Sequence, residues 1–591
     1  MLEQRNLVLA IVLSIAIILG FEILSPKTEP LPEVQSTANT PASNTVSSST
    51  PSSGVPGAGT STSSVPTPGG TAGVPGSKAI AEARSTVVSQ APRIRFDNGR
   101  VRGSISLVGA RIDDLTLDDY RETVDPTSPN IVMLSPANAA NPYYADFGWT
   151  TAPGSTVKVP TPTTRWQARS GITLSQDTPV VLSWDNGEGF VFKRTIAIDE
   201  NFLFTITNSV ANNTTAPVTL FPYGLVSRLN TPTTTGFYIL HEGPLGVLQD
   251  TLVEQDYEDL VDAGRIAQKT TGGWIGITDK YWLMALIPNQ KSEFEASFNH
   301  SAVNKVDKYQ VDFLQNGRTI AAGSSTEVSN HLFAGAKEVH LLDRYEETLG
   351  VHRFDLAVDF GWFYFLTKPF FYAIDWFYKL LGNFGLAILA LTVCVRIVFF
   401  PLANKSFKAM SAMKKLQPEI KKLREQYGDD RTKMNQAMME LYKKEKANPM
   451  AGCLPIALQI PVFFSLYKVL FVSIEMRHAP FYGWIGDLSA QDPTSIANLF
   501  GLISWTPPAY IPALGVWPII MGITMFLQQK LNPQPADPLQ AKIFMFLPIM
   551  FTFMLASFPA GLVIYWSWNN TLSMAQQYLI MKRAGVPIGD K

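Results

Sequence analysis

LTVCVRIVFFPL, residues 391–402, places one charged side chain inside an otherwise apolar run. The run extends from Phe384 to Leu402, which is long enough for a helix that crosses a bilayer. Arg396 lies just past its middle. A guanidinium stays charged in proteins, and a charge at that depth costs roughly 3 kcal/mol or more. This cost predicts that Arg396 either reaches the headgroups or serves a function.

The composition is typical of a membrane protein with a large water-exposed part. The chain has 591 residues, of which 46% are hydrophobic and 16% charged, with 48 basic residues against 49 acidic ones. Both cysteines, Cys394 and Cys453, lie in apolar segments, so the rest of the chain has no disulfide framework. The sequence lacks the motifs of hydrolases, nucleotide-binding loops and Cys/His metal sites. It therefore predicts no enzyme activity, no cofactor and no metal.

The N-terminal part combines an apolar segment with a polar tether. Residues 1–25 contain an apolar run from Leu7 to about Leu24, and no small-residue cleavage pattern follows it. We expect an uncleaved membrane anchor with Arg5 on the cytoplasmic side, and a cleaved signal peptide is the alternative. Residues 26–92 are rich in Pro, Ser, Thr and Gly, which predicts a flexible linker.

Short strand-like runs separated by turn residues fill residues 93–350. FLFTITNSV (202–210) alternates apolar and polar residues, as a half-buried strand does. GWIGITDKYWLMALIP (273–288) has two apolar runs around Asp279, which predicts a hairpin. No long helical period competes with these patterns. The region is predicted to be a large all-β sandwich domain.

Aromatic residues crowd residues 351–383, where Lys368, Pro369 and Asp375 interrupt the apolar pattern. This predicts an amphipathic helix in the membrane interface, with a first spanning turn as the alternative.

Five apolar stretches follow and, with the N-terminal anchor, predict six spans. They are span 2 (384–402) and, within residues 451–580, Cys453–Val472, Pro512–Leu527, Ile543–Phe558 and Gly561–Ile580. The prolines of ISWTPPAYIPALG leave the start of span 4 open and the insertion at 494–515 without a role.

The distribution of charge sets the predicted orientation. Residues 403–450 contain 12 Lys and Arg against six Asp and Glu, so this loop is predicted to be cytoplasmic. Counting spans in both directions puts residues 93–350 outside and both termini inside, with Lys582 and Arg583 in the cytoplasmic tail 581–591. In a bacterial-type inner membrane, the protein is then a multi-pass α-helical membrane protein with a periplasmic β domain.

Arg396 has no acidic partner in these spans. The five C-terminal stretches contain no Asp or Glu, and Glu475 lies beyond the outer end of its span. Thr392 is one turn away on the same helix face, and Gln459 and Asn569 are polar residues of other spans. We expect them to line a hydrated cavity that opens to the cytoplasm and attracts carboxylates. The alternative is a guanidinium that snorkels to the headgroups.

The cytoplasmic loop 403–450 has two apolar stripes at helical spacing, one before and one after Gly428. They predict a cytoplasmic helical hairpin in which the stripes largely bury each other. Its basic face can dock anionic lipids or ribosomal RNA, and its methionines can adapt to apolar partners. The candidate docking residues are Met410, Met413, Lys414, Lys415, Lys421 and Lys422.

Several long strings give the chain a resemblance to a known family. QPEIKKLREQYGDD, MMELYKKEKANPMAGCLPIALQIPVFFSLYKVL, APFYGWIGDLSAQDP and FPAGLVIYW resemble the bacterial YidC membrane insertases, part of the YidC/Oxa/Alb insertase family. The resemblance is close across 360–580 and looser before it. It implies a five-helix insertase core around a hydrophilic groove that holds one arginine, here Arg396. Where many relatives have Tyr-Tyr, this chain has Tyr565-Trp566.

The resemblance also implies a function and its partners. Members act as insertases and chaperones that move nascent inner-membrane segments into the bilayer, alone or with the Sec translocon. The implied partners are nascent membrane proteins, the Sec translocon, the ribosome and signal-recognition machinery, and anionic lipids, without a small-molecule substrate or cofactor. By motif position, the groove residues are Thr392, Ile460, Phe463, Tyr565 and Trp566. Two other functions stay open: an anion transporter that binds at Arg396, and a scaffold whose outer domain binds partners.

Overall fold

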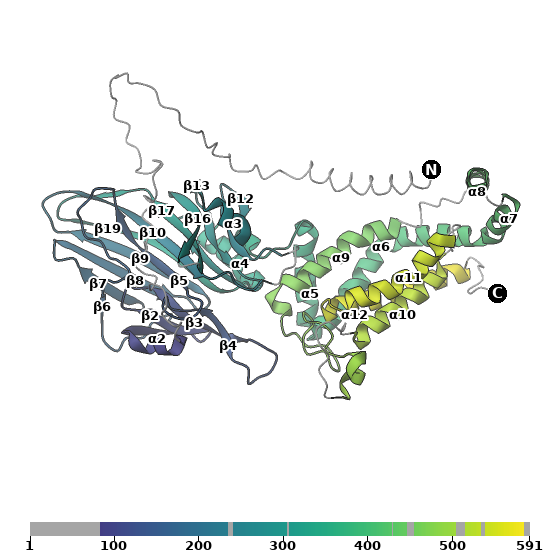
Figure 1. Ribbon diagram of the computed structural model, residues 1–591, viewed down its shortest axis with the longest axis horizontal. Coiled ribbons are helices and arrows are strands. Elements are labelled where there is room, and N and C mark those ends of the chain that lie inside the picture. Colours follow the sequence, from purple (N-terminus) through teal and green to yellow (C-terminus); the bar gives the residue numbers. More distant parts are fainter. Residues whose placement is uncertain are drawn as a thin grey trace, which may run out of the picture. The chain divides into compact units, whose positions relative to one another are not determined.

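The computed structural model describes residues 83–234, 240–303, 306–427, 430–445, 454–503, 514–532 and 538–583 (Figure 1). The predicted N-terminal anchor and residues 26–82 of the predicted linker lie outside the described residues. The end of that linker differs from the prediction, because Arg84–Gln90 forms a helix, α2. Arg84 pairs with Asp114 at 2.5 Å, which ties this helix to the following domain.

Two antiparallel sheets form the domain that the sequence predicts to be a β sandwich (Figure 1). The first sheet has the order β1 (Arg93–Asp97), β2 (Val101–Ser106), β3 (Ile112–Arg121), β5 (Tyr143–Thr151), β10 (Val218–Leu229), β17 (Val306–Gln315), β16 (Glu293–Val303) and β13 (Arg265–Thr271), with β4 (Asn130–Leu134) beside β3 and β18 (Arg318–Ile320) beside β10. The second has the order β12 (Thr251–Glu254), β11 (Gly243–Leu248), β14 (Trp274–Thr278), β15 (Trp282–Ile287), β19 (Ser324–Ala336), β9 (Leu203–Asn212), β8 (Phe190–Ile198), β7 (Val180–Asp185) and β6 (Gln167–Ala168). A short helix, α3 (Tyr257–Ala263), follows β12.

The period-two pattern of the sequence explains these strands. Burial along β9 alternates from Phe204 onward, as the FLFTITNSV stretch predicts. The predicted hairpin at 273–288 is also confirmed, because β14 and β15 pair in antiparallel register with Ile275 opposite Leu286. Side chains such as Phe204, Trp274 and Phe313 are fully buried in the core of the domain.

A buried ionic group crosses the interior of the β domain. Arg194 on β8 lies 3.7 Å from Asp146 on β5 and donates to the carbonyl of Ala110 and to the side chain of Asn208. Burial lowers the pKa of Arg194 and raises that of Asp146, and their mutual attraction opposes both shifts. Breaking such a pair is costly because the remaining charge stays buried without a partner.

The rest of the chain is helical. The helices are α4 (Val339–Leu349), η1 (Phe354–Ala357), α5 (Tyr364–Leu381), α6 (Phe384–Lys415), α7 (Gln417–Tyr427), α8 (Arg431–Lys444), α9 (Leu454–Val472), η3 (Ile474–Met476), η4 (Ile496–Gly501), α10 (Val516–Leu531), α11 (Pro538–Leu555) and α12 (Ala560–Arg583). α12 contacts α6, α9 and α10, and α11 packs on α10 (Figure 1). Gly522 allows that last approach, since a Cβ there would clash with the Thr552 hydroxyl.

The helix that carries Arg396 is longer than predicted. α6 begins at Phe384 as expected but continues through Pro401 to Lys415, so the first part of the predicted cytoplasmic hairpin extends the span. It is the one helix in the described ranges that is both long and apolar enough to cross a membrane, with a mean hydropathy of 2.4. Gln459–Val472 and Lys542–Leu555 are shorter apolar helical stretches. The six spans and the hairpin stay predictions.

Lys337, at the end of β19, gives a test of the packing of the β domain. The side chain is buried, and its ammonium donates to Thr278 Oγ1 at 2.8 Å. Burial lowers the pKa of Lys337 to about 8. The unfolded chain therefore holds this proton up to higher pH than the folded chain, so stability rises with pH from about 8 to about 10.5.

We predict that Lys337→Met raises the free energy of unfolding at pH 7 by up to about 3 kcal/mol and removes this rise above pH 8. Urea titrations of the full chain in detergent, followed by near-ultraviolet circular dichroism at pH 7 and pH 10, measure both effects. Lys193→Met on the exposed side of β8 is the control and should change neither. Equal or lower stability of Lys337→Met at pH 7 would contradict the prediction.

Candidate functional site

Arg396 makes hydrogen bonds to neutral groups of α12. Its Nε donates to Asn569 Oδ1 at 2.9 Å, and its Nη2 donates to Asn569 Oδ1 at 2.6 Å, to the Asn569 carbonyl at 3.1 Å and to Ser573 Oγ. None of the ion pairs in the described part of the chain includes Arg396. Glu475 accepts a hydrogen bond from the backbone of Val339 instead. The guanidinium keeps its full positive charge.

The acceptors come from one polar stripe of α12. Asn569 and Ser573 are one turn apart and share the helix face that contacts α6. Asn570 and Gln577 are buried on a neighbouring face toward α10, where Asn570 donates to Thr524 Oγ1 and Gln577 donates to the Leu531 carbonyl. α12 therefore presents neutral polar groups to both α6 and α10.

Gln459 and the aromatic residues link α9 to α12. Gln459 Nε2 donates to the Tyr565 hydroxyl. One turn further on, the ring of Phe463 lies 4.7 Å from the ring of Trp566, centroid to centroid. Tyr565 is only 1% exposed, whereas Ile460 is 48% exposed. The structure thus brings Arg396, Gln459, Phe463, Tyr565, Trp566 and Asn569 onto adjoining surfaces of three helices and leaves Ile460 at the outside.

Some buried polar atoms beside this cluster have no hydrogen-bond partner in the described residues: Ser465 Oγ, Gln576 Nε2 and Gln577 Oε1. Buried polar atoms are usually paired with protein or water, so these atoms fit a hydrated interior. Thr392 is different, because its hydroxyl donates to the Ile388 carbonyl of its own helix and the residue is 2% exposed. It packs beside the site without offering a free polar group to it.

Lys468 is a charged residue within the apolar helix α9, and it was not among the predicted site residues. Its ammonium lies 2.7 Å from Asp359, which precedes α5. The signal was present in the sequence, because a lone lysine interrupts the apolar run of Cys453–Val472. Its partner was not predictable, since Asp359 is 109 residues away along the chain.

The predicted docking residues divide between the surface and the interior. Met410 is buried in a small apolar cluster with Ala403, Phe407 and Ile580, so it holds α6 against α12 and is not part of an exposed face. Met413 packs partly against the same cluster. Lys415, Lys421 and Lys422 are exposed, and Lys414 is half-buried. The basic residues alone stay available for a docking role.

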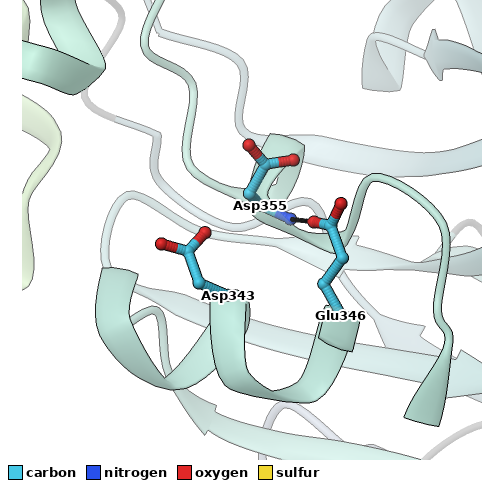
Figure 2. Close-up of side chains that lie close together, drawn as sticks. All are labelled: Asp343, Glu346 and Asp355. Atoms are coloured by element: carbon cyan, nitrogen blue, oxygen red, sulfur yellow. Dashed lines mark hydrogen bonds between the residues drawn. The ribbon is translucent and has the colours of Figure 1, made fainter. Parts of the chain in front are cut away.

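Three carboxylates of Asp343, Glu346 and Asp355 converge between α4 and η1 (Figure 2). Their oxygen atoms lie within 4.8 Å of one another, which is close enough for a metal ion. However, the ammonium of Lys368 lies 3.0 Å from Asp343 Oδ1 and 2.5 Å from Asp355 Oδ2. Burial opposes ionisation of Asp355, but hydrogen bonds from Lys368 and Tyr364 lower its pKa. The cluster is a structural ion pair that fixes α5.

The fold and the site define a class of protein: a helical membrane protein with a β-sandwich domain and an arginine held by neutral acceptors between its helices. Comparison with known proteins identifies the family. Residues 93–373 match the model of the YidC periplasmic domain, and residues 376–586 match the model described as 60Kd inner membrane protein. The chain belongs to the YidC family of membrane protein insertases.

Two relatives named as YidC insertases match this chain over most of its length. The membrane protein insertase YidC of Methylobacterium sp. (strain 4-46) is 52% identical over 606 aligned positions, which cover 99% of this chain and 96% of that one. The YidC insertase of Nitrobacter hamburgensis is 54% identical and covers 86% of each chain. A crystal structure described as an active YidC insertase, with its first transmembrane domain resolved, covers 83% of this chain at 16% identity and a TM-score of 0.35.

Proposed function

We propose that this protein moves nascent segments of inner-membrane proteins from the cytoplasm into the bilayer through a hydrophilic groove around Arg396, alone or with the Sec translocon. The observation that carries the proposal is the neutral surroundings of the guanidinium, which leave its charge free for a substrate. Ribosomes, signal-recognition machinery and anionic lipids are the proposed partners of the basic residues of α7 and of the end of α6.

The electrostatic part of the mechanism is attraction of a carboxylate. A unit charge 4 Å from Arg396 gains about 1 kcal/mol in water and about 4 kcal/mol at an effective dielectric constant of 20. Asn569 and Ser573 hold the guanidinium in place without neutralising it, so the acidic tail of a substrate gains this energy on entering. The groove also shortens the apolar distance that the tail must cross.

The apolar part of the mechanism follows the surface of α9. Ile460 and Phe464 are exposed beside the Phe463–Trp566 contact, and they offer a hydrophobic path from the polar site toward lipid. Partitioning of the substrate segment drives the step, at a few tenths of a kcal/mol for each apolar residue. Tyr565 is buried, so in this proposal it supports the wall through Gln459 and does not contact the substrate.

The first test changes the charge at the site. We predict that Arg396→Ala and Asn569→Asp each reduce insertion of a single-span substrate with an acidic tail about tenfold, because the first removes the charge and the second neutralises it. Arg396→Lys should retain most of the activity. Insertion into proteoliposomes of the purified variants, measured by protease protection of the tail, gives the rates.

A substrate whose tail has Asn and Gln in place of Asp and Glu is the control, and it should respond much less to all three variants. Equal insertion of the acidic substrate by wild type and by both Arg396→Ala and Asn569→Asp would contradict the charge role. If the same proteoliposomes instead carry a flux of small anions that depends on Arg396, the protein is a transporter.

The second test concerns hydration of the groove from the cytoplasm. In a chain with Cys394→Ser and Cys453→Ser, we predict that Ser573→Cys reacts with a membrane-impermeant maleimide in inverted membrane vesicles, because the nearby guanidinium favours the thiolate. Ser567→Cys is the matched control on the same helix. It is as buried as Ser573 but lies about 9 Å further toward the start of α12 and makes no hydrogen bond with Arg396, so it should react at least tenfold more slowly because of its position along the helix. Equal rates would contradict a groove that opens to the cytoplasm.

A further inference from the structure

The segment between α9 and α10 lies at the periplasmic end of the helices. α6 begins directly after the region that matches the periplasmic domain, so its first residues mark that side. Asn383, the N-cap of α6, donates to the Pro480 carbonyl at 3.2 Å. The first backbone amide groups of α12 also bind this segment, since Gly561 N–H donates to the Leu488 carbonyl at 2.9 Å. The segment therefore packs on the starts of two helices.

Asp492 holds the base of this segment rigidly. The side chain is 3% exposed and accepts hydrogen bonds from Trp484 Nε1 at 3.1 Å, from Thr494 Oγ1 at 2.6 Å and from the backbone N–H of Trp517 at 2.9 Å. The last of these caps the first turn of α10, where a negative charge is favourable. Thr494 Oγ1 in turn accepts from the backbone of Val516 at 3.0 Å. One carboxylate thus ties both ends of the loop together.

Beyond Asp492 and Thr494, residues 496–503 form a tip whose large apolar side chains are exposed. Leu499 and Phe500 have φ angles of 50° and 59°, a left-handed conformation that bulky residues rarely adopt. Such strain persists only where the surroundings enforce it. The exposed fraction is 86% for Leu502, and five large apolar residues within 496–503 are exposed: Ile496, Leu499, Phe500, Leu502 and Ile503.

The sequence around this tip contains no charge. Residues 493–529 include no Asp, Glu, Lys, Arg or His, so the uncharged run continues from the tip into α10. α10 itself exposes Ile523 and Leu527, as a lipid-facing helix does. Tyr482 and Trp484, which are 63% and 46% exposed, lie on the same periplasmic segment. Exposed Tyr and Trp residues are enriched at the level of the lipid headgroups.

We propose that residues 496–503 form an apolar tip that inserts into the periplasmic leaflet of the bilayer, with Tyr482 and Trp484 at the headgroups. The occupant of the exposed surface is lipid acyl chain, because the surface is uncharged and continues into the lipid-facing side of α10. The buried Asp492 makes the tip rigid, so the tip fixes the depth of the start of α10. This anchoring does not depend on Arg396 or on insertion activity.

The test measures the depth of a probe on the tip. The fluorophore NBD is attached to Leu502→Cys in the full chain with Cys394→Ser and Cys453→Ser, reconstituted into phosphatidylcholine–phosphatidylglycerol liposomes. Leu502 is the most exposed residue of the tip, so the substitution leaves the packing unchanged. Phe546→Cys on the exposed side of α11 is the reference inside lipid, and Ser155→Cys in an exposed turn of the β domain is the reference in water.

We expect 5-doxyl lipid to quench the Leu502 probe at least half as strongly as the Phe546 probe. Aqueous iodide should quench it at least fivefold less than the Ser155 probe. Iodide quenching equal to that of the Ser155 probe would overturn the proposal, because the tip would then lie in water. Protection from both quenchers would also overturn it, because another segment of this chain or a second copy would then cover the tip.

Discussion

The helical core depends on a guanidinium that cannot lose its proton. Arg396 stays charged when it is buried, so the surrounding helices must supply acceptors. α12 supplies them from Asn569 and Ser573, both on the face toward α6. This requirement accounts for a stripe of amide and hydroxyl side chains in a helix that otherwise packs as an apolar element, and it explains why α6 and α12 lie in contact.

Two other basic side chains near this core are paired with carboxylates. Lys368 binds two carboxylates at the start of α5, and Lys468 pairs with Asp359. In both places the charge is neutralised, and the pair joins segments that are distant in sequence. Arg396 is joined to α12 by hydrogen bonds to Asn569 and Ser573, without a carboxylate. The proposed function rests on this difference, because a charge without a carboxylate partner can attract a substrate carboxylate.

Much of the fold, and Arg396 in the candidate site, could be predicted from local patterns in the sequence. Alternation in FLFTITNSV identified β9, and the interrupted apolar run identified Arg396 and the start of α6 at Phe384. The end of α6 was not predictable, because the apolar run stops at Leu402 whereas the helix continues through charged residues to Lys415. Long-range pairs were also beyond the sequence: nothing in its spacing links Lys468 to Asp359, or shows that Met410 is buried against Ile580.

The two ends of the helical core differ in their polar groups, and this difference bears on the direction in which a substrate would move. Toward the periplasm, Asp492 and the first turns of α10 and α12 satisfy one another, and apolar side chains surround them. Around Arg396 and further along α12, the buried amides of Gln576 and Gln577 keep unpaired atoms. Under the proposed function, a polar tail gains both hydrogen bonds and charge attraction in that second region, because Arg396 has no carboxylate partner in the described residues and unpaired amide atoms lie further along α12. In the same proposal, a tail from the cytoplasm is bound within the core, and its release outward depends on the pull of the apolar segment that follows it.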